Sequence, residues 1–523
     1  MNLRISTPNI NQYKFTFKKS ENNIQNNGLE RTPKTDTFKM SVGYVNDIHG
    51  QTNNMIRILS GLEGDLKVSA GDNDIGDEKN KPVNTAVAKF LTMAGIRASA
   101  LGNHELDTTQ KDFIDTFSKY DGDILASNLQ SHHLDAIDDE KGRADVENFV
   151  KKSIVVDVKG EKVGLIGAAP IDLKKRLAHA DYHENIDIDV LEDTIEDIQD
   201  EIDDLKEQGI NKIFLLSHLG NKTDKEIVKH IDGVDVIIGG HTHELIKDIK
   251  EGENLFYSPS GEPIIITEAG KDGKYFGKLN LTFDSNGVIT EAQNNLAKSN
   301  FYHKNMVNQY IFDKILGKPE EVGFVKDAPL PPETLKEENP HANFMCDAMR
   351  MELGTDIALW NNGGARNYFK AGIVDTSDIK DIAPFSDRVT VAKVSEETLV
   401  NTFKHAIETT YKSQGNKPGL IAVSGLNYTV DSKLGKLVGM NFVDKNGNEH
   451  YINVEDPSKE QLYSVATDSF MMSSGADYDR LAPKDECEEL PYNKDYITCE
   501  YIKHLDKPII INQTGRINFI NND

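Results

Sequence analysis

Short runs of aliphatic and β-branched residues alternate with amphipathic stretches from about residue 38 onward. This alternation predicts an α/β protein, α+β when taken as a whole, in which helices cover the faces of β-sheets. Polar residues directly follow five of the expected strands, at residues 41–45, 66–70, 96–101, 213–217 and 236–239. Ligands of such sheets bind beyond the carboxyl ends of the strands, so we expect a functional site there.

Helical spacing is clearest in residues 191–205, where acidic residues fill the face opposite an apolar stripe of Leu191, Ile195, Ile198, Ile202 and Leu205. Residues 307–316 also favour a helix. The Asn-Gly pairs at 286–287 and 446–447 predict hairpin turns, because Asn-Gly favours positive φ.

The length of 523 residues exceeds what one hydrophobic core usually supports, so at least two domains are expected. Gly, Pro, Glu and Lys interrupt the pattern at 317–332, and a second alternating region begins near Thr334. We therefore expect four segments: a flexible leader at 1–36, a first domain at 37–300, a helical and Pro-rich linker at 301–333, and a second α/β domain at 334–518.

Composition narrows the classes of function. Hydrophobic residues make up 38% of the chain and charged residues 28%. No apolar run approaches the roughly 20 residues of a transmembrane helix. A formal net charge of −26 opposes binding to nucleic-acid polymers, so a phosphate-bearing substrate should be small. The leader lacks the apolar core of a secretory signal, so the sequence does not identify the compartment. It does not identify the oligomeric state either.

Cysteine usage indicates neither a disulfide framework nor a cysteine metal site. The chain holds three cysteines, Cys346, Cys487 and Cys499, an odd number at wide spacing. Free thiols are the favoured interpretation, and pairing of Cys487 with Cys499 is the alternative.

Donors suited to divalent metals stand at the ends of the expected strands: Asp47, His49, Asp72, Asn103, His218, His241 and His243. A single Asp-x-His or a single histidine is typical of a surface pair or a buried core residue. Seven donors at successive strand ends of one fold can instead converge in space. Mixed His and carboxylate donors are compatible with divalent ions, with Zn, Mn or Fe as candidates.

In order and content, these motifs resemble the calcineurin-like metallophosphoesterases and, among them, the 5′-nucleotidase family, over about residues 40–270. The resemblance implies a four-layer sandwich that binds two divalent metals. It assigns Asp47, His49, Asp72 and His243 to the first metal, and Asp72, Asn103, His218 and His241 to the second, with Asp72 as the bridge. His243 departs from the Gln of well-studied bacterial members, which bears on metal preference.

His104 directly follows Asn103 and should face the phosphate, where an imidazole can stabilise developing charge or assist the leaving oxygen. Asp107 could orient that imidazole; the alternative is that Asp107 only caps a helix. The family resemblance implies a catalytic His/Asp pair at His104 and Asp107.

The second domain carries short motifs at residues 360–366, 383–385, 423–426 and 474–478, which resemble in this order the substrate domain of 5′-nucleotidases. The resemblance implies that Asn361 and Arg366 meet polar parts of the substrate. It implies that Phe385 forms one face of a clamp on the base, and that Asp477 contacts the ribose. The second aromatic is Phe470, unless Met471 occupies that position. Lys336 stands near a position where the family has arginine, which it would not replace equivalently.

Together these features predict a dimetal enzyme that converts nucleoside 5′-monophosphates, and other nucleotides where the site admits them, to nucleoside and phosphate. The nucleotide is expected to be a small-molecule partner. Within enzymes, the alternatives are a 2′,3′-cyclic nucleotide phosphodiesterase, a nucleotide-sugar hydrolase and a protein phosphatase. A nucleotide-binding protein without activity is the alternative from another class. Members of the family are commonly periplasmic, cell-surface or secreted.

Overall fold

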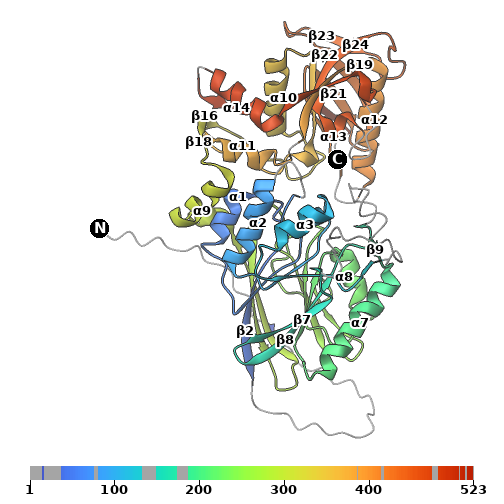
Figure 1. Ribbon diagram of the computed structural model, residues 1–523. Coiled ribbons are helices and arrows are strands. Elements are labelled where there is room, and N and C mark those ends of the chain that lie inside the picture. The colour runs from blue at the N-terminus through green and yellow to red at the C-terminus, as the bar shows by residue number, and fades with distance from the viewer. Residues whose placement is uncertain are drawn as a thin grey trace, which may run out of the picture. The chain divides into compact units, whose positions relative to one another are not determined.

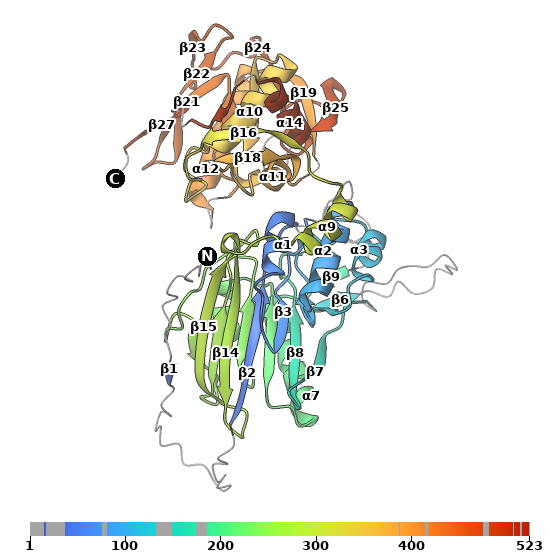
Figure 2. The same cartoon turned by 90° about the vertical axis from the view of Figure 1, so that its left-hand side faces the viewer.

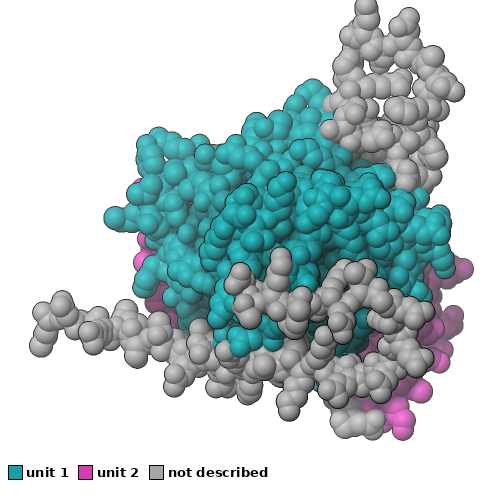
Figure 3. All heavy atoms as spheres, turned by 90° about the horizontal axis from the view of Figure 1, so that it is seen from below, with its two compact units in different colours: residues 1–317 teal, residues 318–523 magenta. Residues whose placement is uncertain are grey.

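The computed structural model describes residues 15–16, 37–75, 81–131, 149–173, 186–385, 387–413, 417–473, 481–505, 507–512 and 515–521. The chain divides into two compact units, Met1–Gly317 and Lys318–Asp523 (Figure 3). Each unit contains helices and several β-sheets, so the expected α/β class is confirmed. Asp477 and most of the leader lie outside the described residues.

Two large sheets form the centre of unit 1. The first has the order β1 (Phe15–Thr16), β15 (Ile289–Lys298), β14 (Tyr275–Phe283), β2 (Phe38–Val45), β3 (Leu66–Ser69), β4 (Ala98–Ala100) and β5 (Asp123–Leu125). The second has the order β12 (Leu255–Tyr257), β13 (Pro263–Thr267), β11 (Val236–Gly239), β10 (Ile213–Ser217), β8 (Glu161–Ala168) and β7 (Ser153–Val158). A small sheet pairs β6 (Leu129–Ser131) with β9 (Ile186–Ile188). Strands β2 to β5 are parallel, as are β8, β10, β11 and β13.

Helices cover the outer face of each large sheet (Figures 1 and 2). The first sheet packs against α1 (Thr52–Ile58), α2 (Lys81–Ala94), α3 (Gln110–Phe117) and α9 (Met306–Leu316), and the second against α7 (Leu191–Glu207) and α8 (Asn221–Ile227). Side chains of β10 alternate between two cores: Phe214 and Leu216 pack between the sheets, while Leu215 packs toward α7. The result is the predicted four-layer sandwich.

Two short segments differ from the expectation of a leader and a linker. Phe15 and Thr16 pair with Ala292 and Glu291, so two residues of the leader add an edge strand to the first sheet. Phe312 on α9 is fully buried in the core of unit 1, whereas β16 (Glu321–Asp327) pairs with two strands of unit 2. The expected linker at 301–333 is therefore divided: α9 belongs to the core of unit 1, and β16 belongs to a sheet of unit 2.

A mixed five-stranded sheet is the centre of unit 2, in the order β20 (Ile421–Ser424), β17 (Ile357–Asn361), β24 (Leu462–Asp468), β19 (Arg388–Ser395) and β25 (Cys487–Asn493). One face packs against α10 (Pro340–Leu353), α11 (Thr376–Ile382) and α14 (Lys494–His504). The other faces α12 (Glu396–Lys412) and a sheet of β23 (Glu449–Ile452), β22 (Lys436–Val443), β21 (Leu426–Asp431) and β27 (Ile517–Ile520). A third sheet joins β18 (Gly372–Asp375), β16 and β26 (Ile509–Ile510).

The local predictions from residue patterns agree with these elements. Helix α7 covers the acidic amphipathic stretch, and the two Asn-Gly pairs connect β14 with β15 and β22 with β23. All three cysteines are free, so the alternative pairing of Cys487 with Cys499 is wrong. Among the described residues, helices lack the combined length and apolar character that crossing a bilayer would require.

The packing of α9 yields a stability prediction. Phe312→Ala should lower the free energy of unfolding of unit 1 by about 3–5 kcal/mol, because it leaves a cavity in a closed core. Tyr310→Ala, on the same helix but 61% exposed, is the matched control and should change it little. Calorimetry of the full-length variants gives the measurement. Equal small effects of both changes would contradict the assignment of α9 to this core.

Candidate metal centre

The seven expected metal donors follow the carboxyl ends of strands in both large sheets of unit 1. Asp47 and His49 follow β2, Asp72 follows β3 and Asn103 follows β4. His218 follows β10, and His241 and His243 follow β11. Because neighbouring parallel strands end at the same edge of a sheet, the donors from each sheet arrive side by side.

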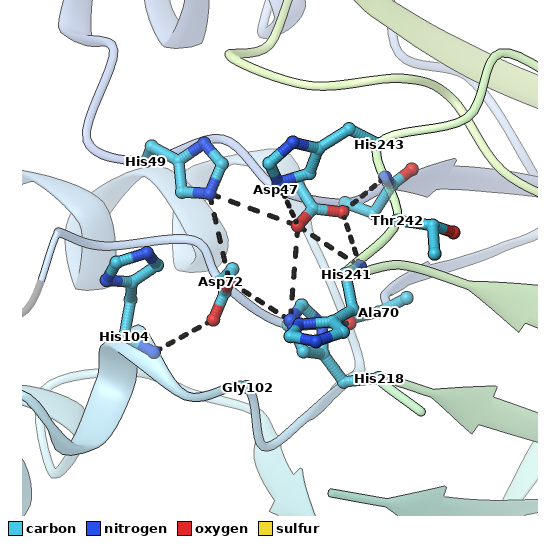
Figure 4. A network of polar contacts seen from close by, with 12 residues as sticks. Asp47, His49, Ala70, Asp72, Gly102, His104, His218, His241, Thr242 and His243 are labelled. Atoms are coloured by element: carbon cyan, nitrogen blue, oxygen red, sulfur yellow. Dashed lines mark hydrogen bonds and ion pairs between the residues drawn. The ribbon is translucent and has the colours of Figure 1, made fainter. Parts of the chain in front are cut away.

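Six of these side chains form two groups of potential ligand atoms (Figure 4). Within each group the ligand atoms lie within 4.8 Å of one another; the groups are Asp47, His49 and His243, and Asp72, His218 and His241. Asp72 Oδ2 lies 3.0 Å from Nε2 of His218 and 3.8 Å from Nε2 of His49. The carboxylate of Asp72 thus stands between the groups, where a bridging ligand is needed.

The polar atoms of the site fit divalent cations. Nε2 of His49, Nε2 of His218 and Oδ1 of Asn103 are buried and make no hydrogen bond within the described residues. Nδ1 of His218 must donate to the Ala70 carbonyl, 2.6 Å away, because that oxygen can only accept. Nε2 is therefore the nitrogen whose lone pair faces an ion when the ring is neutral, as in histidines that bind metals.

Backbone strain is concentrated at the same residues. Asp47, Asp72 and His49 have φ of 50°, 50° and 51°, and the φ values of His241 and His243 are 74° and 63°. A left-handed conformation costs a non-glycine residue on the order of 1–2 kcal/mol. Five such residues at one site indicate that the surrounding structure compensates for the strain, because the side chains must point in particular directions.

The carboxylates of Asp47 and Asp72 are almost completely buried, and their charges shift the pKa values of the neighbouring histidines. Burial alone would raise the pKa of Asp72, but the neighbouring His218 and His104 hold it well below its usual range. Burial would lower the pKa of His218, but Asp72 and Asp47 raise it to about 10. For His243, burial outweighs the attraction of Asp47 and lowers the pKa to about 4. The site is a buried anionic cluster that attracts positive charge.

Asp272 is a supporting residue that the strand-end motifs did not reveal. Its Oδ1 lies 3.1 Å from Nδ1 of His49, and its Oδ2 accepts a hydrogen bond from Lys274 at 2.9 Å. Its backbone N–H donates to the Asp47 carbonyl at 2.6 Å. Asp272 therefore fixes the ring of one metal-binding candidate and the backbone of another.

Glu105 supports the opposite side of the site. Its fully buried carboxylate accepts hydrogen bonds from the backbone N–H groups of Asp72, Asn73 and Gly102, at 3.0, 2.7 and 2.9 Å. Burial, with the charge of Asp72, raises its pKa to about 7. A side chain in place of the hydrogen at Gly102 would collide with the Asp72 carboxylate. This packing holds the ends of β3 and β4 together.

His104 and Asp107 form a hydrogen-bonded pair at the edge of the cluster. Nδ1 of His104 lies 2.6 Å from Oδ2 of Asp107, and the backbone N–H of His104 donates to Oδ1 of Asp72 at 2.9 Å. Both side chains are about one-fifth exposed. The following helix, α3, is capped by Thr109. The alternative that Asp107 serves only as a helix cap is therefore wrong.

Four of the expected substrate residues lie near the ends of neighbouring strands in unit 2. Asn361 is the last residue of β17, and the guanidinium of Arg366 lies 5.1 Å over the Phe385 ring. In the register of β19 and β24, Val389 pairs with Asp468, so Phe385 and Phe470 both lie beyond this end of the sheet. By strand register and by the Arg366–Phe385 contact, these residues lie at one end of the sheet.

The exposed fractions separate the two candidates for the second aromatic. Phe470 is 41% exposed, whereas Met471 is fully buried in the core that includes α12. Phe470 is therefore available to a ligand and Met471 is not. Lys336 places its ammonium 4.7 Å over the ring of Tyr411. Asp477 lies outside the described residues.

Comparison with known families agrees with this two-part arrangement. Residues 40–245 match the calcineurin-like phosphoesterase family, and residues 321–482 match the 5′-nucleotidase C-terminal domain. The chain belongs to the 5′-nucleotidase family. It is thus a phosphoric-ester hydrolase, and two divalent cations are its cofactors, for which the Asp and His groups of unit 1 provide donors.

Individual relatives support the family assignment. A trifunctional nucleotide phosphoesterase of Bacillus subtilis is 26% identical over 93% of this chain, which spans 35% of that relative's length. A 5′-nucleotidase of Diplobatis ommata is 27% identical over 83% of this chain and 78% of its own. The solved structure of a 5′-nucleotidase precursor from Thermus thermophilus shares the fold, with a TM-score of 0.71, 20% identity and coverage of 93% and 100%.

The contact between Asp272 and His49 leads to a prediction about how tightly this member of the family binds its metals. Asp272→Asn should weaken binding of divalent cations about 10- to 100-fold, because the amide no longer holds the imidazole as a charged acceptor. Asp284→Asn is the control, because the β14–β15 turn lies next to Phe38, at the opposite end of β2 from Asp47. Competition titration with a chelator gives the affinities. Unchanged affinity in a folded Asp272 variant would contradict this role.

Proposed function

We propose that this chain hydrolyses nucleoside 5′-monophosphates to nucleoside and phosphate, with the phosphate held at the metal centre of unit 1 and the nucleoside recognised by unit 2. The observation that carries the proposal is the carboxylate of Asp72 between two histidine-containing groups, with the His104–Asp107 pair beside it. This arrangement suits phosphate chemistry. The family's C-terminal domain makes a nucleotide the natural phosphate ester.

The chemistry at the phosphorus follows from the donors. When bound, two divalent cations neutralise phosphate oxygens and lower the pKa of a water molecule for in-line attack. Asp72, whose carboxylate lies between the two groups of donors, would hold both cations. His104 donates a hydrogen bond from Nε2 to the phosphate or to the leaving oxygen, which supports charge that develops in the transition state. Asp107 accepts a hydrogen bond from Nδ1 and stabilises the doubly protonated imidazolium, the form in which Nε2 also has a proton to donate.

The recognition chemistry is that of an aromatic clamp with polar neighbours. Phe385 and the exposed Phe470 offer faces for stacking on the base, which contributes roughly 1–3 kcal/mol per base. Every base has such a face, so we expect broad base tolerance. Asn361 and Arg366 supply hydrogen bonds to polar groups of the nucleotide. Asp477 is proposed to meet the ribose hydroxyls.

The proposal divides recognition between the two units. One nucleotide then needs both units for efficient turnover, because its phosphate is assigned to unit 1 and its nucleoside to unit 2. Binding energy from the base and ribose is then used to position the phosphate.

A second candidate function concerns other phosphate esters. The Bacillus subtilis relative is named a trifunctional nucleotide phosphoesterase, which favours activity on more than one class of nucleotide ester, and 2′,3′-cyclic nucleotides are the alternative that the sequence left open. A panel of nucleoside monophosphates, cyclic nucleotides, nucleotide sugars and phosphoprotein, assayed with Zn, Mn and Fe, tests both functions. The proposal expects the highest kcat/KM on a nucleoside 5′-monophosphate. A preference for phosphoprotein, or no phosphate release at all, would refute it.

The proposed roles of His104 and Phe385 predict different kinetic defects. His104→Ala should lower kcat about 100- to 10,000-fold on AMP and on p-nitrophenyl phosphate, because general acid–base help acts on either ester. Phe385→Ala should raise KM for AMP about tenfold, as expected for loss of one stacking face, and spare p-nitrophenyl phosphate.

Matched controls separate these effects from general damage. His230→Ala removes a surface histidine paired with Glu226, and Phe324→Ala removes a phenylalanine of unit 2 that is 48% exposed. Both should keep wild-type kinetics. Equal losses on both substrates for Phe385→Ala would argue against a base clamp.

A further inference from the structure

A buried lysine occupies an unfavourable position in unit 2. Lys494 is the first residue of α14, and its side chain is only 1% exposed. Lysine is almost never fully buried unless it is paired. The N-terminus of a helix also carries a partial positive charge, which disfavours a cation there. Specific partners must therefore stabilise this ammonium group.

Two groups contact the ammonium, and the charge of a third acts on it. Nζ of Lys494 donates a hydrogen bond of 2.8 Å to Oδ2 of Asp468, whose side chain is 3% exposed. The same atom lies 5.4 Å over the ring of Trp360, within the range of a cation–π interaction. Burial would lower the pKa of Lys494, but the charges of Asp468 and Asp387 raise it, so the side chain stays charged.

Each partner adjoins a residue that we propose for nucleoside recognition. Trp360 directly precedes Asn361, and Asp387 follows Phe385 by two residues. Asp468 caps the short helix α13 (Ser469–Met472), where its Oδ1 accepts from the Met471 N–H at 2.8 Å. That cap sets the turn in which Met471 is buried and Phe470 is exposed.

The sheet explains why one side chain reaches three segments. Strands β17, β24, β19 and β25 are neighbours in this order, and Arg388 at the start of β19 pairs with Asn493 at the end of β25. Lys494 follows Asn493, so it begins its helix beside the strand ends that carry the other segments.

We propose that Lys494 is a positioning residue for nucleoside recognition, which holds the segments of Asn361, Phe385 and Phe470 in one arrangement through Trp360, Asp387 and Asp468. This inference rests on the proposed function. A buried ion pair adds little net stability compared with apolar residues of similar size, because desolvation offsets the attraction. Its directional contacts can instead define the geometry of the segments that it joins.

The test uses Lys494→Met in the full-length chain loaded with metal. This change should raise KM for AMP about tenfold with little change in kcat, and leave p-nitrophenyl phosphate hydrolysis within about twofold of wild type. Trp360 is the only tryptophan of the chain, so its fluorescence emission reports directly on loss of the overlying charge and should shift. Lys503→Met, on the same helix but 40% exposed, is the control and should change neither property.

A second variant covers the risk that Asp468, left unpaired, prevents folding. Lys494→Met combined with Asp468→Asn leaves no buried charge in this pair and keeps a residue that caps helices well. It should fold and still show the raised KM, because no cation joins the three segments. A wild-type KM for AMP in either folded variant would overturn the inference while the proposed function stands. Failure of the wild-type chain to hydrolyse AMP would overturn both.

Discussion

Two carboxylates, Asp47 and Asp72, are buried at the sheet edges of unit 1, and the design of that unit depends on keeping them charged there. An isolated buried carboxylate is costly unless positive charge or hydrogen bonds compensate it. Five histidines, His104 among them, surround the pair, and the unpartnered nitrogens of His49 and His218 point to compensation by ions and not by protons alone. The fixed negative charge of these buried carboxylates favours the binding of cations. Phosphate hydrolysis, which needs the cations, therefore depends on the same charge.

Holding this charge in place requires support from residues that need not touch a substrate. Glu105 accepts hydrogen bonds from backbone N–H groups that follow two strand ends. Asp272 contacts the ring of His49 through its carboxylate and donates its backbone N–H to the Asp47 carbonyl. The left-handed backbone at five of the donors stores strain, which the surrounding four-layer packing must offset. Rigid sheets make that possible, because parallel strands fix the origins of the loops on which the donors stand.

Patterns along the chain predict the parts of this structure that depend on local chemistry. Buried parallel strands such as β10 are continuous apolar runs, and the donors that follow them are conspicuous as histidines and aspartates next to glycines. Asp272 also lies beside a glycine, yet its partner His49 is 223 positions away, and such a pairing has no local signature. The same holds for Phe312, whose burial assigns α9 to unit 1, and for the choice between Phe470 and Met471, which tertiary packing decides.

The charges of the two units suggest how an anionic substrate can be bound by an acidic protein. With a formal net charge of −26, the chain as a whole repels nucleotides at long range, so attraction must come from local cations. In unit 1 the metal ions would supply this attraction, whereas in unit 2 the candidate is a side chain of the chain itself, Arg366 over the Phe385 ring. Arg366 stands at the site that we propose for the nucleoside, whereas Lys494, which pairs with Asp468, is sealed from solvent. Its charge is balanced by Asp468 and thus acts on the segments around it and not on the nucleotide. A buried, paired cation can fix the shape of a binding site without attracting anions from solution. Selection of the nucleotide would then depend on the metal centre and on the proposed aromatic clamp.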